Sequence, residues 1–374
     1  MKRIVVCCDG TWNQPDQVSP TNVVKVALSL RDRDRAGVVQ RVFYNSGVGT
    51  GSFDRLRGGA LGFGLSRHVR ECYRFLVENY EPGDELYFFG FSRGAFTARS
   101  AAGLVRNSGI LRREHQSRID DAFTLYRGRD PLSHPRGTRA TLFRRSFSYE
   151  PRVHFMGVWD TVGALGVPIL GPGWANVLGR RWQFHDTDLS TRVDLAYQAL
   201  AIDEERGPFV PTLWIRQEGA GTQVLEQVWF AGVHSDVGGG YPDPSLAELP
   251  LLWLVDRAAK AGLEFQDGYF SGRAPADPAA ADEARAMGRY VAPDSAGQVT
   301  GSRRGIYRLL RRHARDPGRE RASGRDQVAD GQSIASTARD RVAAGGYGSA
   351  GLREFLDGGG AVTEVRTVPG LPDQ

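Results

Sequence analysis

The stretch ELYFFGFSRGAFTAR, Glu85–Arg99, joins an apolar run to a segment of small residues through one serine. The run Glu85–Phe91 is continuously apolar after its first residue, which is typical of a strand covered on both faces in a parallel sheet. A helical pattern follows at once. Ser92 would therefore occupy a tight turn between a strand and a helix, where Gly90 and Gly94 leave room that a Cβ atom would fill.

Similar runs recur along the chain and alternate with helical patterns. Strands are expected at Ile4–Cys8, Arg41–Gly51 (ending in a glycine-rich loop), Val153–Trp159 and Gln227–Val233, and helices at Val23–Leu30, around 69–79, from Arg93 to about Asn107, and at Ser245–Ala261. Thr21 could cap the first of these helices, and Ser245 with Glu248 has the spacing of a capping box for the last. This alternation predicts a doubly wound and mostly parallel sheet. Together with the G-x-S-x-G pattern Gly90–Gly94 between a strand and a helix, it predicts an α/β-hydrolase-like fold.

The 374 residues suffice for one large α/β domain or two ordinary ones. We expect a catalytic domain at residues 1–265, with an Arg-rich cap or lid inserted at about 111–152. Residues 266–374 are rich in Ala, Gly, Arg and Asp and show little apolar pattern. We expect them to form an extension of loops and short helices, partly disordered and packed on the same domain.

Composition excludes several classes of protein. The excess of 48 basic over 43 acidic residues is small and scattered, which suits an anionic substrate or a transient contact with a membrane surface. No nucleic-acid-binding motif accompanies it. Cys7, Cys8 and Cys72 form neither a disulfide framework nor a zinc pattern, and no metal or cofactor is expected. The apolar start is too short for a signal peptide, and no membrane span is present, so a cytoplasmic location is expected.

A serine nucleophile needs a base, and His234 is the best candidate among seven histidines. It ends the apolar run VWFAGV and opens HSDVGGGY, so it would lie on a loop just beyond a late strand, where α/β-hydrolases keep their general base. The alternative is that His234 only fastens the glycine loop Gly238–Gly240.

Asp160 is the preferred acid because it ends VHFMGVWD, a second strand terminus at the same sheet edge. The chain order Ser92, Asp160, His234 is that of α/β-hydrolases. Asp203 is the alternative acid, although we expect it in a helix as a packing or ion-pair partner. Asp236 is a further rival that could instead shape the glycine loop.

The oxyanion hole is expected to use the backbone N–H of Arg93 together with the loop after the first strand. In that loop Gly10 and Thr11 would supply backbone donors, and Asp9 would position the loop. An ordinary Asp-Gly turn is the simpler alternative.

Parts of the sequence resemble the patterns of three other functions. A haloacid dehalogenase-like phosphatase requires an acidic nucleophile where this chain has Cys7. Dinucleotide binding at Gly47, Gly49 and Gly51 fails because residue 52 is Ser. A catalytically inactive binding or scaffold protein remains the alternative to an enzyme.

Four motifs together resemble one family: CDGTWN, GFSRGAFTAR, GVWDTVG and VWFAGVHSDVGGGY, in that order within residues 1–265. It is the uncharacterised α/β-hydrolase domain family that includes the type VI secretion lipase effectors of the first class. The resemblance implies a Ser/Asp/His esterase with phospholipase A-type activity, with Ser92, Asp160 and His234 at the matching positions. We therefore expect a serine hydrolase of carboxylic or phospholipid esters.

Overall fold

The computed structural model describes residues 1–10, 19–47, 60–163, 188–303, 305–308, 311–322 and 326–371. The strands are β1 (Arg3–Cys8), β2 (Gln40–Asn45), β3 (Glu85–Phe91), β4 (Ile110–Leu111), β5 (Ser148–Tyr149), β6 (Val153–Trp159), β7 (Asp188–Leu189), β8 (Val193–Ala201), β9 (Ile215–Arg216), β10 (Val224–Phe230), β11 (Gln332–Ala335) and β12 (Val362–Thr363). The α-helices are α1 (Asn22–Ser29), α2 (Ala60–Asn79), α3 (Arg93–Ser108), α4 (Ile119–Arg127), α5 (Thr138–Phe147), α7 (His234–Gly238), α8 (Glu248–Lys260), α9 (Pro278–Ala286), α10 (Ser336–Ala343) and α11 (Ala350–Asp357). Short 3₁₀ turns are η1 (Arg113–Arg118), η2 (Gly207–Phe209) and η3 (Gly305–Arg308).

A central sheet organises the fold. Within the described residues it has eight strands in the order β12-β11-β10-β8-β6-β3-β1-β2, and every neighbouring pair is parallel. The predicted α/β fold with a doubly wound parallel sheet is confirmed. Because all eight strands run the same way, their carboxyl ends share one edge, which is where ligands bind in such sheets.

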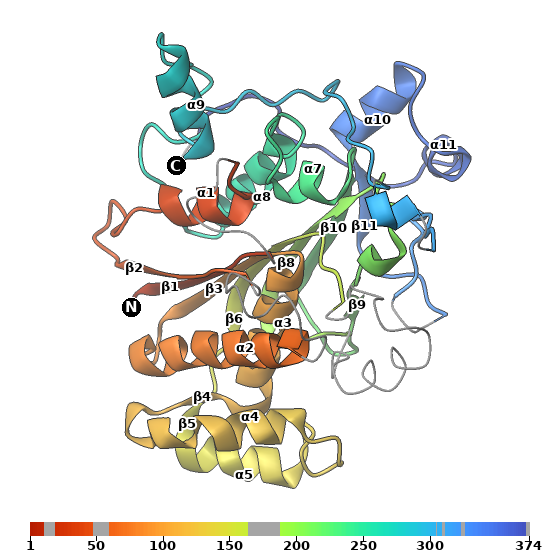
Figure 1. Ribbon diagram of the computed structural model, residues 1–374. Coiled ribbons are helices and arrows are strands. Elements are labelled where there is room, and N and C mark those ends of the chain that lie inside the picture. Colours follow the sequence, from red (N-terminus) through yellow and green to blue (C-terminus); the bar gives the residue numbers. More distant parts are fainter. Residues whose placement is uncertain are drawn as a thin grey trace.

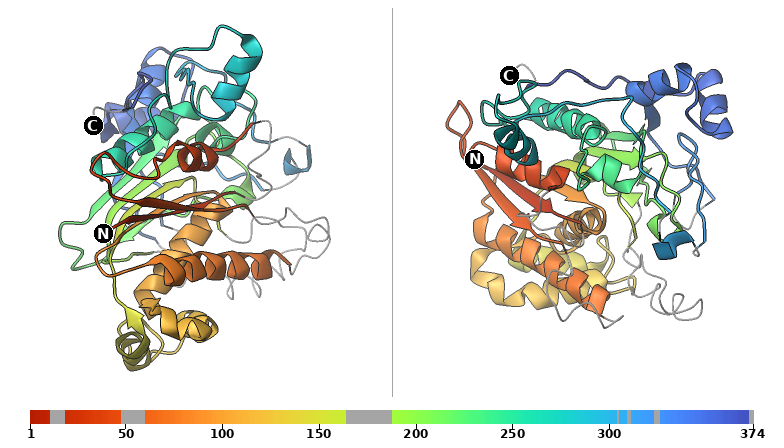
Figure 2. Two further views of the ribbon diagram at one scale, coloured as in Figure 1. Left: turned by 90° about the vertical axis from the view of Figure 1, so that its left-hand side faces the viewer. Right: turned by 45° about the horizontal axis from the view of Figure 1, so that its top comes forward.

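Helices cover both faces of the sheet (Figures 1 and 2). Along β1, Ile4, Val6 and Cys8 belong to the core under α2 and α3, whereas Val5 and Cys7 belong to the core under α1 and α8. This alternation between two buried faces explains why the strand is continuously apolar. In the part of the chain described, no helix is both long enough and apolar enough to cross a bilayer.

Several predicted elements match the structure closely. The strands Glu85–Phe91 and Val153–Trp159 have the predicted bounds, and α3 begins at Arg93. The side chain of Thr21 caps α1 by accepting a hydrogen bond from Val24 N.

Two local predictions were wrong. Asp203 does not lie in a helix. It follows strand β8, which ends two residues earlier at Ala201. Ser245 and Glu248 do not form a capping box, because α8 begins at Glu248 itself with Ala247 as its N-cap. The buried carboxylate of Glu248 instead pairs with Arg285 (3.1 Å).

The region 266–374 contributes to the sheet, which the expectation of loops and short helices did not include. Strand β11 pairs with β10, and β12 pairs with β11, both in parallel. These strands have only four and two residues, too few to show a periodicity in the sequence. The predicted division at residue 265 stays a prediction.

The Arg-rich segment at 111–152 forms η1, α4 and α5, which pack on α2 and α3. Figure 1 shows α4 and α5 on the side of these helices that faces away from the sheet. A lid function for this segment stays a prediction.

The start of α3 touches the loop after β1. A Cβ atom on Gly94 would collide with the carbonyl groups of Cys8 and Asp9, and one on Gly90 would lie 2.6 Å from Ala95 Cα. Both glycines are therefore needed for close packing of backbone on backbone, which brings the β1 loop beside Ser92.

Gly94→Ala is expected to destabilise the protein by about 1–3 kcal/mol, because the rigid carbonyl groups cannot move aside without backbone shifts. Urea unfolding followed by circular dichroism measures the change. Gly351→Ala in α11 is the matched control, since its Cβ would meet nothing closer than Asp316 Oδ1 at 3.6 Å. The control should be neutral or stabilising by up to about 1 kcal/mol. Equal stability of Gly94→Ala and the wild type would contradict the packing argument.

Candidate active site

Ser92 occupies the turn between β3 and α3. Its backbone has φ 57° and ψ −123°, a conformation that residues with a Cβ atom rarely adopt. The N–H of Ser92 donates to Trp159 O (3.0 Å), and its carbonyl oxygen accepts from Phe96 N (3.3 Å). Such strain costs of the order of 1–3 kcal/mol and persists only where the surroundings enforce it. Here the turn places the hydroxyl of this buried serine at the carboxyl edge of the sheet, within reach of His234.

Asp160 follows β6 directly and is completely buried. Its φ of 37° is also in the left-handed region. Its N–H donates to Ala199 O (2.8 Å), and its Oδ1 accepts from Ala201 N (3.1 Å). Both partners belong to the neighbouring strand β8, so the sheet itself fixes the carboxylate.

His234 is the first residue of α7, which begins just beyond β10. Its ring lies between two aromatic side chains, 4.6 Å from the ring of Phe91 and 4.9 Å from that of Phe209, measured between centroids. Its backbone N–H lies 3.3 Å from Glu204 Oε2. These contacts leave the imidazole little freedom to rotate.

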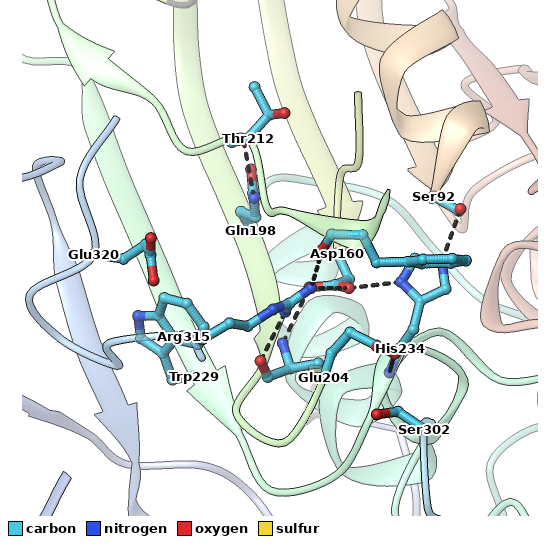
Figure 3. A network of polar contacts seen from close by, with 12 residues as sticks. Ser92, Asp160, Gln198, Glu204, Thr212, Trp229, His234, Ser302, Arg315 and Glu320 are labelled. Atoms are coloured by element: carbon cyan, nitrogen blue, oxygen red, sulfur yellow. Dashed lines mark hydrogen bonds and ion pairs between the residues drawn. The ribbon is translucent and has the colours of Figure 1, made fainter. Parts of the chain in front are cut away.

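The structure brings Ser92, His234 and Asp160 into one hydrogen-bonded chain (Figure 3). Nδ1 of His234 lies 2.6 Å from Asp160 Oδ2, and Nε2 lies 2.7 Å from Ser92 Oγ. Ser92 and Asp160 lie close together because β3 and β6 are neighbouring strands in which Phe91 is paired with Trp159. The residues after these two therefore leave the sheet at the same level, and α7 brings the ring between them.

Burial and charge act on the two ionisable members of this chain in different ways. Burial lowers the pKa of His234 below its ordinary 6.5, and the hydrogen bond to Asp160 offsets only part of that effect. Burial alone would raise the pKa of Asp160, but the charges of Arg315 and His234 outweigh it and hold that pKa well below its ordinary value. The acid is therefore ionised and the imidazole neutral at pH 7.

A second buried ion pair flanks the histidine. Glu204 is fully buried and accepts from Arg206 Nε (2.9 Å) and Nη2 (2.7 Å). The Arg206 guanidinium also covers the ring of Phe209 at 3.6 Å. Because Phe209 in turn contacts His234, this pair supports one wall of the site.

The loop after β1 has a more definite hydrogen-bond pattern than the sequence indicated. Asp9 Oδ1 accepts from Gly10 N (2.6 Å), and Oδ2 accepts from the hydroxyls of Thr21 (2.8 Å) and Tyr44 (2.7 Å). The Asp9 carboxylate thus connects the Gly10 N–H to the start of α1 and to β2, and its role in positioning the rest of the loop stays a prediction. Thr11 lies outside the described residues. A role of Gly10 or Thr11 in an oxyanion hole stays a prediction.

The two rival acids lie elsewhere. Asp203 Oδ2 accepts from Tyr347 Oη and Gly232 N, both at 2.7 Å. Asp236 accepts from Val233 N (3.0 Å) and from the N–H and hydroxyl of Thr300. Each carboxylate therefore fastens a loop, and neither has a hydrogen bond to the His234 ring.

Two further observations concern metal-binding groups and cavities. Among the described residues, no group of three or more His, Cys, Asp or Glu side chains is arranged to hold a metal ion. A cavity of about 1180 Å³ lies between α3 and the small β7–β9 sheet, and none of Ser92, Asp160 and His234 lines it.

Sequence reasoning missed Glu204, Arg206 and Arg315. The first two lie in the stretch ALAIDEERGPF that supplied Asp203, and its adjacent acids and arginine were a signal of an ion pair. Arg315 had no signal, because it lies among other arginines in a region without pattern.

The fold and this site define an α/β-hydrolase-like protein with a serine on a strand-to-helix turn. Residues 2–257 match the family described as the T6SS phospholipase effector Tle1-like catalytic domain. The chain belongs to this family, as its four motifs implied.

The individual proteins that resemble this chain share between 19% and 30% sequence identity with it. An uncharacterised protein of Saccharomyces cerevisiae, YEL023C, is 30% identical over 230 residues, which are 56% of this chain and 32% of that protein, so the chain spans about a third of its length. An uncharacterised protein from Pseudomonas aeruginosa of known structure is 19% identical with a TM-score of 0.40, covering 71% of this chain and 46% of that one. The Tle1 effector bound to the VgrG spike of the type 6 secretion system is 19% identical with a TM-score of 0.37, covering 64% and 51%.

The His234 ring is expected to titrate below pH 6.5, because burial penalises the imidazolium more than Asp160 stabilises it. NMR of protein labelled in its histidine rings measures the midpoint, and His234→Gln identifies the resonance by its loss. A midpoint for His234 above 6.5 would contradict this electrostatic account.

Proposed function

We propose that this protein is a serine hydrolase that cleaves carboxylic esters, with phospholipids as its substrate class. The observation that carries the proposal is the chain of contacts from Ser92 Oγ through His234 to Asp160, at 2.7 and 2.6 Å. Membership of a phospholipase effector family supports the choice of lipid. The three side chains come from separate elements that are distant in sequence.

In the proposed mechanism, Ser92 Oγ attacks the ester carbonyl carbon while His234 Nε2 takes the hydroxyl proton. Asp160 holds the proton on Nδ1 and stabilises the imidazolium that forms. The imidazolium then protonates the leaving alkoxide as the C–O bond breaks, which leaves an acyl-serine. Water attacks the acyl group with His234 again as base, and the carboxylic acid and free Ser92 are released.

The developing oxyanion would be stabilised at the start of α3. Arg93 is the first residue of this helix, and N–H groups at a helix N-terminus have no acceptor within the helix. The helix dipole adds partial positive charge at the same end. The Arg93 N–H, next to the nucleophile, is therefore the proposed first donor of the oxyanion hole.

The side chain of Arg93 favours an anionic substrate. Its guanidinium is partly buried and forms no ion pair with any residue that the structure describes. Burial lowers its pKa to about 10, so it stays cationic at neutral pH. A guanidinium on the residue next to the nucleophile, without an ion pair among the described residues, matches a phosphodiester head group, which Arg binds through two N–H groups.

Purified protein is expected to hydrolyse phospholipid vesicles and p-nitrophenyl esters, and Ser92→Ala should lose activity by roughly a millionfold in kcat, the scale seen when a hydrolase loses its nucleophile. Fatty-acid release and p-nitrophenol absorbance are the readouts. Cleavage of short esters without cleavage of lipid would remove the phospholipid assignment only. A wild type inert to esters and to a fluorophosphonate probe would favour the alternative, an inactive binding or scaffold protein.

Asp160→Asn should reduce kcat by about 10⁴-fold, because an amide donates to Nδ1 and holds the wrong tautomer. Asp203→Asn is the matched control, an equally conservative change at a half-buried loop carboxylate, and it should retain most of the activity. Kinetics on one p-nitrophenyl ester compare the two variants. The reverse ranking would identify Asp203 as the acid.

A further inference from the structure

Arg315 lies far outside the catalytic motifs and beyond the residues that match the family. Its side chain is completely buried. Nη1 donates to Asp160 Oδ1 (2.6 Å) and Ala201 O (2.7 Å), while Nη2 donates to Asp160 Oδ2 (3.0 Å) and Phe209 O (2.8 Å). Four hydrogen bonds thus fix the guanidinium against the carboxylate, and Figure 3 shows it on the opposite side of Asp160 from His234.

The carboxylate of Asp160 is shared between two partners. Oδ1 accepts from Ala201 N and Arg315, and Oδ2 accepts from His234 Nδ1 and Arg315. An arginine that engages both oxygens fixes the plane of a carboxylate, because the guanidinium fork matches its geometry. The orientation of Oδ2 toward the imidazole therefore depends on Arg315 as well as on the sheet.

The same contact has an electrostatic effect on the histidine. A carboxylate favours the imidazolium, and a cation paired with that carboxylate opposes this effect. Both act strongly here because the guanidinium and the carboxylate are excluded from water.

We propose that Arg315 is a positioning residue of the active site, which orients the Asp160 carboxylate toward His234 and partly neutralises its charge. This inference rests on the proposed hydrolase function for its catalytic consequence. It assigns to the segment after residue 265 a direct part in the site.

Other charged groups surround the histidine and are unchanged in the test. Glu204 and Arg206 follow β8 and pair with each other. Asp236 is in α7, Tyr241 follows it, and Glu320 lies beyond Arg315, where it interacts with His313. Removing Arg315 therefore changes one charge in an otherwise constant surrounding.

A purely structural tie is the competing explanation, in which Arg315 only fastens the C-terminal segment to the sheet. Such a tie would affect stability without moving the titration of His234. Arg3 provides the matched control, because it forms a comparable arginine–aspartate pair with Asp34 at 2.6 Å, with both side chains largely buried. This pair lies at the start of β1, the opposite edge of the sheet from Ser92.

The experiment compares Arg315→Met, Arg315→Lys and Arg3→Met in the full chain. In Arg315→Met, the acid limb of kcat/KM on a p-nitrophenyl ester should move to higher pH, and kcat should fall roughly 10- to 100-fold with KM nearly unchanged. Arg3→Met should lose stability without either change. Arg315→Lys, which keeps the charge but not the fork, should keep the acid limb of the wild type and still lose kcat.

The NMR titration of His234 gives a readout that needs no activity. Its midpoint should rise in Arg315→Met and stay in place in Arg3→Met, even if no substrate is cleaved, which separates this inference from the proposed function. An unchanged midpoint in folded Arg315→Met would overturn the proposal. Should that variant not fold, Arg315→Lys decides: kcat equal to that of the wild type would show that the fork orients nothing.

Discussion

The fully buried carboxylate of Asp160 determines which groups must meet at the carboxyl edge of the sheet. A charge in that position is tolerable only when hydrogen bonds and an opposite charge replace the lost water. Here β8 supplies a backbone N–H, α7 supplies the imidazole and the C-terminal segment supplies a guanidinium. Three parts of the chain that are distant in sequence must therefore meet at Asp160, and together they form the candidate active site.

The parallel sheet explains how two of the residues in this convergence come to lie side by side. Ser92 and Asp160 leave adjacent strands at the same level, and both have left-handed backbone conformations. Each conformation is unfavourable by itself, yet each is enforced by ladder hydrogen bonds to a neighbouring strand. Rigid elements thus hold the reactive groups, and no loop needs to close before serine and histidine touch.

Sequence alone predicted the elements whose signals are local. The strand before Ser92 and the strand before Asp160 are unbroken apolar runs with clear ends. Their bounds could therefore be predicted, and so could the position of the residue that follows each strand. Strand β8 was missed because Asp194 and Gln198 interrupt its apolar residues and allow a helical interpretation. Arg315 could not have been found, since its partner is 155 residues away and nothing in the local sequence marks a long-range ion pair.

The position of Arg315 has a consequence for biosynthesis. During synthesis, the serine, the acid and the histidine all emerge from the ribosome well before the arginine that locks the acid in place. A growing chain that has reached its histidine still lacks the guanidinium that pairs with Asp160, and β11 and β12 have not yet been added to the sheet. The set of contacts that fixes Asp160 is thus complete only after residue 315 has been synthesised.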